Sequence, residues 1–187
     1  ARIAPGIVFL VVFSNPNIVV ATTADIPVLI TLLNSAYRGE ESKQGWTHES
    51  DLIAGDVRIT EDILADVMSR PDSVLLKYID EEQKIIGCVN LQKHESRIYL
   101  GMFSVSPKLQ GGGIGKKLLI ASEEYAQYLS CTSIYMHVVS LRSELIDWYK
   151  RHGYVETGET KPFTEDGITG KHMQPLEFMV LEKTLVS

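Results

Sequence analysis

Residues 103–117 read Phe-Ser-Val-Ser-Pro-Lys-Leu-Gln-Gly-Gly-Gly-Ile-Gly-Lys-Lys, and this stretch sets the expected fold of the whole chain. A run of β-forming residues, 98–105, leads into it, and a helical pattern follows, with Ile114, Leu118 and Tyr125 on one face. A strand, a glycine loop and a helix form a phosphate-binding layout. Glycines let backbone N–H groups approach an anion, and a helix N-terminus carries partial positive charge.

Three phosphate-binding motifs compete for this stretch. A Walker A loop requires Gly-x-x-x-x-Gly-Lys-Ser/Thr, and Gln110 and Lys117 occupy two of its fixed positions. A Rossmann fingerprint requires Gly-x-Gly-x-x-Gly and fails at Lys116. The third pattern, Gln/Arg-x-x-Gly-x-Gly/Ala, is matched in full by residues 110–115. With Val-Ser-Pro ahead of it, the stretch resembles the acetyl-CoA pyrophosphate loop of the GNAT superfamily of N-acetyltransferases. The alternative is a glycine-rich turn without a ligand.

Composition narrows the class of protein. The chain has 187 residues, 44% hydrophobic and 22% charged, which is typical of a globular domain with a sizeable core. The net charge of −6 argues against nucleic-acid binding and suits a cationic amine substrate. Cys88 and Cys131 lie in apolar runs without metal-ligand spacing, so we expect reduced core residues, no metal and a cytoplasmic location.

The first sixteen residues are interpreted as an N-terminal extension, 1–16, ahead of a single N-acetyltransferase domain, 17–187. Residues 7–13 are apolar, but seven residues are too few to span a bilayer. No small-x-small cleavage site follows them, so we expect an extra strand or a loosely packed extension rather than an export signal. No membrane partner is expected.

The remaining pattern predicts an ordered series of elements. A strand at 18–21 and a helix from Pro27 to about Gly39 precede an irregular polar stretch, in which Thr47 begins a short helix that ends at Ile53. The later elements are a helix at 61–69, strands at 73–79, 84–91 and 97–105, the glycine-loop helix, a strand at 133–139, a helix at 143–152, a strand from Tyr154, a loop at 158–175 and a strand at 176–185.

This order predicts a mixed α/β fold with a central, mostly antiparallel sheet of about six or seven strands flanked by helices. It resembles the GNAT-type acyl-CoA N-acyltransferase fold, in layout over residues 17–185 and in motif over residues 103–154. The resemblance implies acetyl-CoA as co-substrate. It also implies that main-chain groups of the central strand contact the pantetheine arm and the acetyl oxygen, here at Met102, Phe103, Ser104 and Val105. Gly101 predicts a local bulge in that strand.

By the same resemblance, the pyrophosphate is lined by Gln110, Gly111, Gly113, Ile114, Gly115 and Lys116. Lys116 or Lys117 would add Coulomb attraction; the alternative is that both are solvated helix residues. The family places a tyrosine four residues before Gly-Phe/Tyr, and Tyr149 has that spacing from Gly153. Tyr149 is therefore the candidate general acid for the CoA sulfur, or else a core aromatic. Arg142 stands where the family often has an asparagine, so the asparagine's role is not transferred.

The general base is less well marked. Family members often use a glutamate on the central strand, and residues 97–105 contain none. His137 on the following strand is the candidate, with a purely structural histidine as the alternative. Other candidates lie in the polar loop, where a base could also act through water: Glu40, Glu41, His48 and Glu49.

The acceptor site is expected in the same polar loop, because this region forms one wall of it in GNAT proteins. Trp46, His48 and Glu49 combine an aromatic ring with polar and acidic groups that suit an amine or an amino acid. Alternatively, Trp46 plugs the core, and the acceptor wall lies in the 158–175 loop, around Phe163, Asp166 and His172.

These observations predict an acetyl-CoA-dependent N-acetyltransferase that acetylates a primary amine, a small amine or an amino acid, by direct attack in a ternary complex. No cysteine is placed for a covalent acetyl-enzyme. A protein or peptide N-terminal acetyltransferase and a catalytically silent acyl-CoA sensor remain alternatives. A nucleotide-binding protein is disfavoured by the failed motifs. The sequence leaves the oligomeric state open, a homodimer included.

Overall fold

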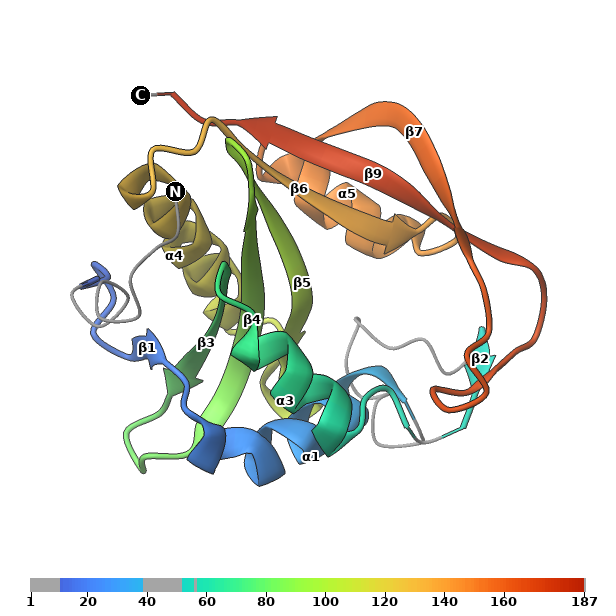
Figure 1. Cartoon of the computed structure of the whole chain (residues 1–187), viewed down its shortest axis with the longest axis horizontal. Helices are drawn as coiled ribbons and strands as arrows, with labels where there is room; N and C mark the ends of the chain where they lie inside the picture. The colour runs from blue at the N-terminus through green and yellow to red at the C-terminus, as the bar shows by residue number, and fades with distance from the viewer. Residues whose placement is uncertain (1–10, 39–51, 56, 187) are drawn as a thin grey trace.

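The computed structural model describes residues 11–38, 52–55 and 57–186. Within these residues, a seven-stranded sheet runs in the order β1-β3-β4-β5-β6-β9-β7 beside a two-stranded sheet, β2-β8 (Figure 1). The strands of the large sheet are β1 (Ile18–Val20), β3 (Ser73–Ile79), β4 (Ile85–His94), β5 (Arg97–Val105), β6 (Ser133–Val139), β7 (Val155–Phe163) and β9 (Leu176–Thr184). The small sheet consists of β2 (Ile53–Ala54) and β8 (Lys171–His172).

Local signals in the sequence account for the helix boundaries. Thr60 begins one helix by accepting a hydrogen bond from the N–H of Ile63 at 3.4 Å, and Pro27 lies in the first turn of another. The helices are η2 (Thr23–Asp25), α1 (Ile26–Tyr37), α3 (Glu61–Ser69), η3 (Pro107–Leu109), α4 (Ile114–Tyr128) and α5 (Ser143–Arg151).

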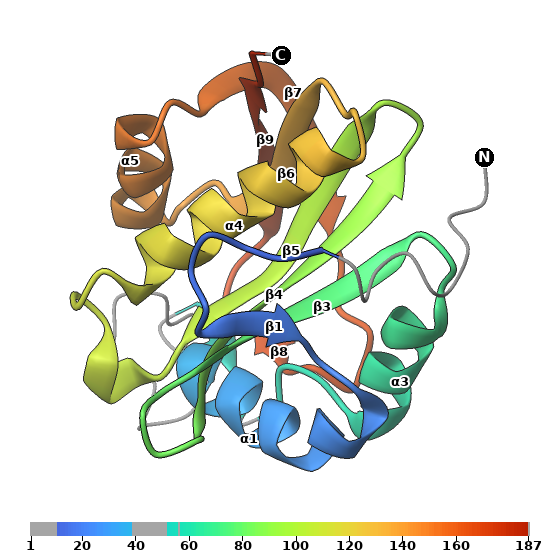
Figure 2. The same cartoon turned by 90° about the vertical axis from the view of Figure 1, so that its left-hand side faces the viewer.

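The helices cover the two faces of the sheet differently. Side chains alternate along a strand, so β3 sends Val74 and Leu76 into the core that contains residues of α4 and α5, and Leu75 into the core of α1 and α3. Figure 2 shows α4 lying across the strands on one side, with α1 and α3 on the other. On the face opposite α4 and α5, the strands β6, β9 and β7 carry Val139, Phe163, Leu176 and Phe178, which pack with Ile53.

The central strands β5 and β6 separate soon after they meet. They are parallel neighbours only from Arg97 to Tyr99, and beyond that point they diverge (Figure 1). A bulge accompanies the divergence. Between the pairs Asn90↔Gly101 and Cys88↔Ser104, two residues of β5 face a single residue of β4, and Met102 has a φ of 51°. The sequence placed this bulge at Gly101, one residue early. The resulting gap positions the site described below.

The predicted mixed fold, with a mostly antiparallel sheet of six or seven strands flanked by helices, is confirmed. Two local predictions were wrong. Residues 158–163 belong to β7 rather than to a loop, and Ile53 lies in β2 rather than at a helix end. β7 is an edge strand whose side chains are exposed along most of its length, so it lacks the alternation that would have marked it.

Part of the predicted N-terminal extension packs against the domain. Phe13 lies in the main core, and the side chain of Ser14 donates a hydrogen bond to Glu124 of α4. The boundary at residue 17 remains a prediction. Among the helices of the described residues, none is both long enough and apolar enough to cross a membrane.

Candidate active site

The glycine loop presents backbone N–H groups at the start of α4. Gly111 and Gly113 have φ values of 95° and 82°, which side-chain-bearing residues rarely adopt. Gly113 is the N-cap of α4, and no side chain of the described residues caps that end of the helix. The first turn therefore leaves donors free that an anion can accept, and the helix dipole adds attraction.

A cleft of about 540 Å³ lies over this loop. It is lined by Gly111, Gly113, Gly115, Lys116, Glu144, Asp147, Trp148, Arg151 and His152. The two lysines that the sequence could not separate differ in position. Lys116 lines the cleft, whereas the Lys117 ammonium lies 6.0 Å from the centre of the Tyr78 ring and lines a different hollow. Lys116 and Arg151 supply positive charge at the cleft.

The end of β5 is joined to the glycine loop by a side chain. Gln110 donates a hydrogen bond from Nε2 to the carbonyl of Val105 at 2.9 Å. Phe103, Ile114 and Gly115 line a small hollow between them, and a Cβ on Gly115 would lie 3.3 Å from the Phe103 ring. The residues predicted to bind the donor, on the strand end and on the loop, are thus brought together.

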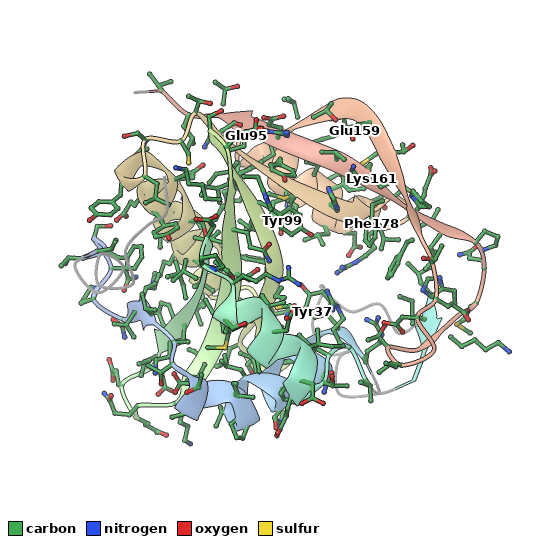
Figure 3. The ribbon with its side chains drawn as sticks, in the orientation of Figure 1. Tyr37, Glu95, Tyr99, Glu159, Lys161 and Phe178 are labelled. Carbon is green, nitrogen blue, oxygen red and sulfur yellow. The ribbon has the colours of Figure 1, made fainter. Side chains whose placement is uncertain are left out.

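A second cavity, of about 90 Å³, lies in the gap between β5 and β6 and reaches both faces of the sheet. Leu145 and Tyr149 line it from α5 on one face, and Tyr99, His137 and Phe178 line it from the other. The remaining lining residues are Tyr37, Arg58, Leu100, Gly101, Met102, Phe103, Met136, Val138, Val139 and Arg142. Figure 3 shows Tyr37, Tyr99 and Phe178 around this opening. The wall of this cavity is therefore built from both faces of the sheet.

Tyr149 is buried, with 3% of its surface exposed, and its ring lies 6.0 Å from that of Phe103. Burial, and next the neighbouring Tyr37, raise the pKa of the Tyr149 hydroxyl well above its usual 10, and Arg142 offsets part of that rise. No hydrogen bond to the described residues occupies this hydroxyl. It is therefore a protonated donor at the cavity wall at neutral pH.

His137 is half-buried on β6, with its ring centroid 5.1 Å from that of Tyr99. Burial, and next the charge of Lys161, lower the pKa of His137 from its usual 6.5. Its Nε2 atom is buried and has no hydrogen-bond partner among the described residues. At neutral pH this gives an uncharged imidazole whose ring nitrogen has capacity to accept a proton.

The side of the cavity nearest α1 carries positive charge. The hydroxyl of Tyr37 donates a hydrogen bond to the carbonyl of Phe103, at the bulge. The guanidinium carbons of Arg58 and Arg142 lie 5.4 Å and 5.7 Å from the centre of the Tyr37 ring. Because Tyr37 occupies the Phe103 carbonyl, the main-chain groups left for a ligand on this strand belong to the neighbouring residues.

Neither of the two cysteines presents a reactive thiol at the cavity. Cys88 is fully buried between β5 and the core of α1, and burial raises the pKa of its thiol to about 12. Cys131 is also buried, at the far end of α4. Neither lines the cavity between β5 and β6.

The structure does not test the predicted acceptor wall. Trp46, His48 and Glu49 lie outside the described residues, as do Glu40 and Glu41. Sequence reasoning considered Tyr37 only as part of a helix face and as the start of the polar loop, and it did not assign three other residues that line the cavity: Arg58, Tyr99 and Phe178. These residues come from different elements. The one sequence signal available was the period-2 pattern of β5 and β6, which puts the cavity residues Tyr99 and His137 on the same face of the sheet.

Comparison with known proteins places the chain among acetyltransferases. The model of the acetyltransferase (GNAT) family matches residues 31–154. No protein in the curated comparison matches the sequence. Among solved structures, the ribosomal-protein-S18-alanine N-acetyltransferase from Escherichia coli is similar, with a TM-score of 0.67, 12% identity and coverage of 91% of this chain and 94% of that chain.

Two further solved structures have the same fold. A putative phosphinothricin N-acetyltransferase has a TM-score of 0.66 and 14% identity, with coverage of 91% of this chain and 98% of that chain. The PaiA N-acetyltransferase from Thermoplasma acidophilum, in complex with coenzyme A, has a TM-score of 0.63 and 18% identity, with coverage of 90% and 98%. At these identities the likeness is one of fold.

Proposed function

The chain belongs to the acetyltransferase (GNAT) family, and from that premise we propose that it transfers the acetyl group of acetyl-CoA to a primary amine by direct attack in a ternary complex. One observation carries the proposal. The cavity between β5 and β6 is lined by residues from both faces of the sheet, so a donor held on the glycine-loop side and an acceptor held on the other side would meet there.

The donor side is assigned to the loop and the strand end. We assign the backbone N–H groups of residues 110–116 to the pyrophosphate, with Lys116 adding charge at the same cleft. The main-chain groups of Met102, Ser104 and Val105 are assigned to the pantetheine arm and the acetyl oxygen. Support comes from the divergence of β5 from β6 after Tyr99, since that edge of β5 then has no neighbouring strand to pair with in the described fold.

The chemistry needs one proton acceptor and one donor. The amine nitrogen forms a C–N bond with the acetyl carbon, the C–S bond breaks, and the electron pair leaves on sulfur. We assign His137 to accept the amine proton, since its uncharged ring has an unpartnered nitrogen at the cavity. We assign Tyr149 to hydrogen-bond the departing sulfur. A thiol pKa is roughly 8.5, so complete proton transfer from a tyrosine whose pKa is raised well above 10 is uphill, and the hydroxyl acts mainly as a hydrogen-bond donor.

The cysteines are consistent with direct transfer. An acetyl-enzyme would require a reactive thiolate at the cavity, and a fully buried thiol with a pKa of about 12, such as that of Cys88, does not supply one at neutral pH. The acceptor wall formed by Trp46, His48 and Glu49 stays a prediction.

The test is release of CoA thiol from acetyl-CoA, monitored with a thiol-reactive dye, while the full chain is offered small amines, amino acids and short peptides. Mass spectrometry identifies the acetylated product. The proposal expects release that depends on a small amine or an amino acid. Calorimetric binding of acetyl-CoA without amine-dependent release would instead identify an acyl-CoA sensor. Release with peptides alone would identify an N-terminal acetyltransferase of proteins.

A further inference from the structure

The cavity contains a guanidinium, that of Arg58, for which the described residues supply no counter-ion. Arg58 and Arg142 both line the cavity and both lie against the Tyr37 ring, and the lining contributed by the described residues includes neither aspartate nor glutamate. Arg142 takes part in further interactions. Arg58, by contrast, forms no ion pair with any carboxylate of the described residues. An arginine in such a position is suited to a bidentate contact with a ligand carboxylate.

The position of Arg58 is fixed by the fold. The side chain of Asn34, on α1, accepts hydrogen bonds from the backbone N–H groups of Arg58 at 2.6 Å and Ile59 at 3.0 Å, and it donates one to the Ile59 carbonyl at 3.3 Å. The Ile59 side chain is buried at 1% exposure. These hydrogen bonds fix the backbone at Arg58 and Ile59. The position of the Arg58 side chain at the cavity therefore follows from the anchored backbone.

Another part of the cavity wall is aromatic. Tyr99, His137 and Phe178, which we call the ring shelf, are half-buried, and the His137 ring lies 5.1 Å from Tyr99 and 5.9 Å from Phe178. Phe163 stacks behind Phe178 at 4.3 Å. The cavity holds about 90 Å³, which is enough for an amino group and an acetyl group but not for an additional ring. An acceptor with an aromatic side chain would therefore lay its ring on the shelf.

We propose that the acceptor is a free α-amino acid with an aromatic side chain, whose carboxylate pairs with Arg58 and whose ring lies on the ring shelf. This inference rests on the proposed function, from which it takes the transfer of an acetyl group to the amine. The reaction then joins the α-nitrogen to the acetyl carbon, with loss of one amine proton to His137, and yields an N-acetyl amino acid and CoA. The N-terminal residue of a peptide has an amide in place of the α-carboxylate and would leave Arg58 without its anion, so a peptide N-terminus is disfavoured.

The experiment compares ligands that differ by one group. Calorimetry with the full chain saturated with CoA measures the binding of L-phenylalanine, of phenethylamine, which lacks the carboxylate, and of L-alanine, which lacks the ring. We expect L-phenylalanine to bind about 10-fold to 100-fold more tightly than phenethylamine, the range for a charge-assisted pair. It should also bind more tightly than L-alanine, through burial of the ring.

Two variants locate the effect. Arg58→Met should abolish the preference for L-phenylalanine over phenethylamine, and the anchor from Asn34 to the backbone should preserve the fold. Arg70→Met is the matched control, because Arg70 is exposed and pairs with Asp66 on α3; it should keep the preference. The inference is overturned if phenethylamine binds as tightly as L-phenylalanine, if the preference survives in Arg58→Met, or if no amino acid binds.

Turnover separates this inference from the proposed function. If L-phenylalanine binds through Arg58 but no amine yields CoA thiol, acetyl transfer is wrong and carboxylate recognition stands. If amines without a carboxylate are acetylated as efficiently as amino acids, acetyl transfer stands and carboxylate recognition is wrong.

Discussion

Replacement of Tyr149 by phenylalanine should slow the chemical step without disturbing donor binding. General acid catalysis is typically worth ~10²–10⁴-fold. Burial raises the pKa of the Tyr149 hydroxyl well above 10, so it stabilises the departing thiolate by a hydrogen bond rather than by complete proton transfer. We therefore expect the lower end of the range, a fall in kcat of about 100-fold, which corresponds to about 2.7 kcal/mol of transition-state stabilisation.

The structure also predicts what Tyr149→Phe leaves unchanged. The hydroxyl makes no hydrogen bond to the described residues, whereas the ring packs 6.0 Å from Phe103 and 5.8 Å from Tyr154. Phenylalanine keeps those ring contacts, so the free energy of unfolding should change by less than about 1 kcal/mol. The affinity for acetyl-CoA should stay nearly the same, because the pyrophosphate is assigned to the loop.

The assay is single-turnover kinetics with acetyl-CoA and an active amine, so that product release does not mask chemistry. Tyr154→Phe is the matched control. Tyr154 is equally buried, at 1% exposure, and belongs to the same aromatic group, but it does not line the cavity. Its kcat should match the wild type. If Tyr149→Phe loses less than about threefold with chemistry rate-limiting, or if the control loses as much, Tyr149 is a packing residue.

Three other outcomes are expected. Gly113→Val should weaken acetyl-CoA binding measured by calorimetry. The control Gly158→Val should bind acetyl-CoA as the wild type does, because Gly158 has a similar φ of 85° and equally open space around it. Equal affinities of the two variants would show that the loop does not bind the phosphates. His137→Gln should lower kcat/KM and remove the fall in wild-type kcat/KM that protonation of His137 causes as the pH drops below 6.5. Because the folded-state pKa of His137 is lowered, its contribution to the free energy of unfolding is fully present above pH 6.5 and is lost as the pH falls further. A difference between wild type and variant that does not change with pH, in kcat/KM and in stability, would contradict both expectations. Tyr37→Phe leaves the buried carbonyl of Phe103 without its donor, so urea unfolding should show a loss of ~1–3 kcal/mol, and an unchanged midpoint would show that the hydrogen bond contributes nothing.

The donor side of the site was predictable because its signal is local. A strand, a glycine run and a helix follow one another within residues 103–117, so the chain itself brings the loop and strand end together. The backbone requirement is also local: Gly111 and Gly113 have positive φ values that glycine accepts readily. Tyr149 was found in the same way, through its spacing from Gly153. Its placement at the cavity, unlike its spacing, depends on the packing of α5.

The acceptor side that we propose was harder to predict because its residues lie on different elements. Tyr37 lies on α1, Arg58 precedes α3, Tyr99 lies on β5 and Phe178 on β9. In the sequence, Tyr37 counts simply as part of an apolar helix face, and Arg58 looks like an ordinary surface charge. Their common position results from the divergence of β5 and β6, which is a property of the whole sheet.

That divergence leaves main-chain groups of β5 without a neighbouring strand in the described fold. A sheet satisfies main-chain groups by pairing neighbouring strands, and β5 loses its β6 neighbour after Tyr99. The fold compensates at one carbonyl, that of Phe103, with the hydroxyl of Tyr37. The bulge at Met102 interrupts the regular pairing at the same place, and we propose that an amide-containing arm pairs with the main-chain groups there. A ligand that pairs there binds the folded state alone and therefore stabilises it by mass action. The proposed binding site is thus located where the pairing of β5 with β6 is interrupted.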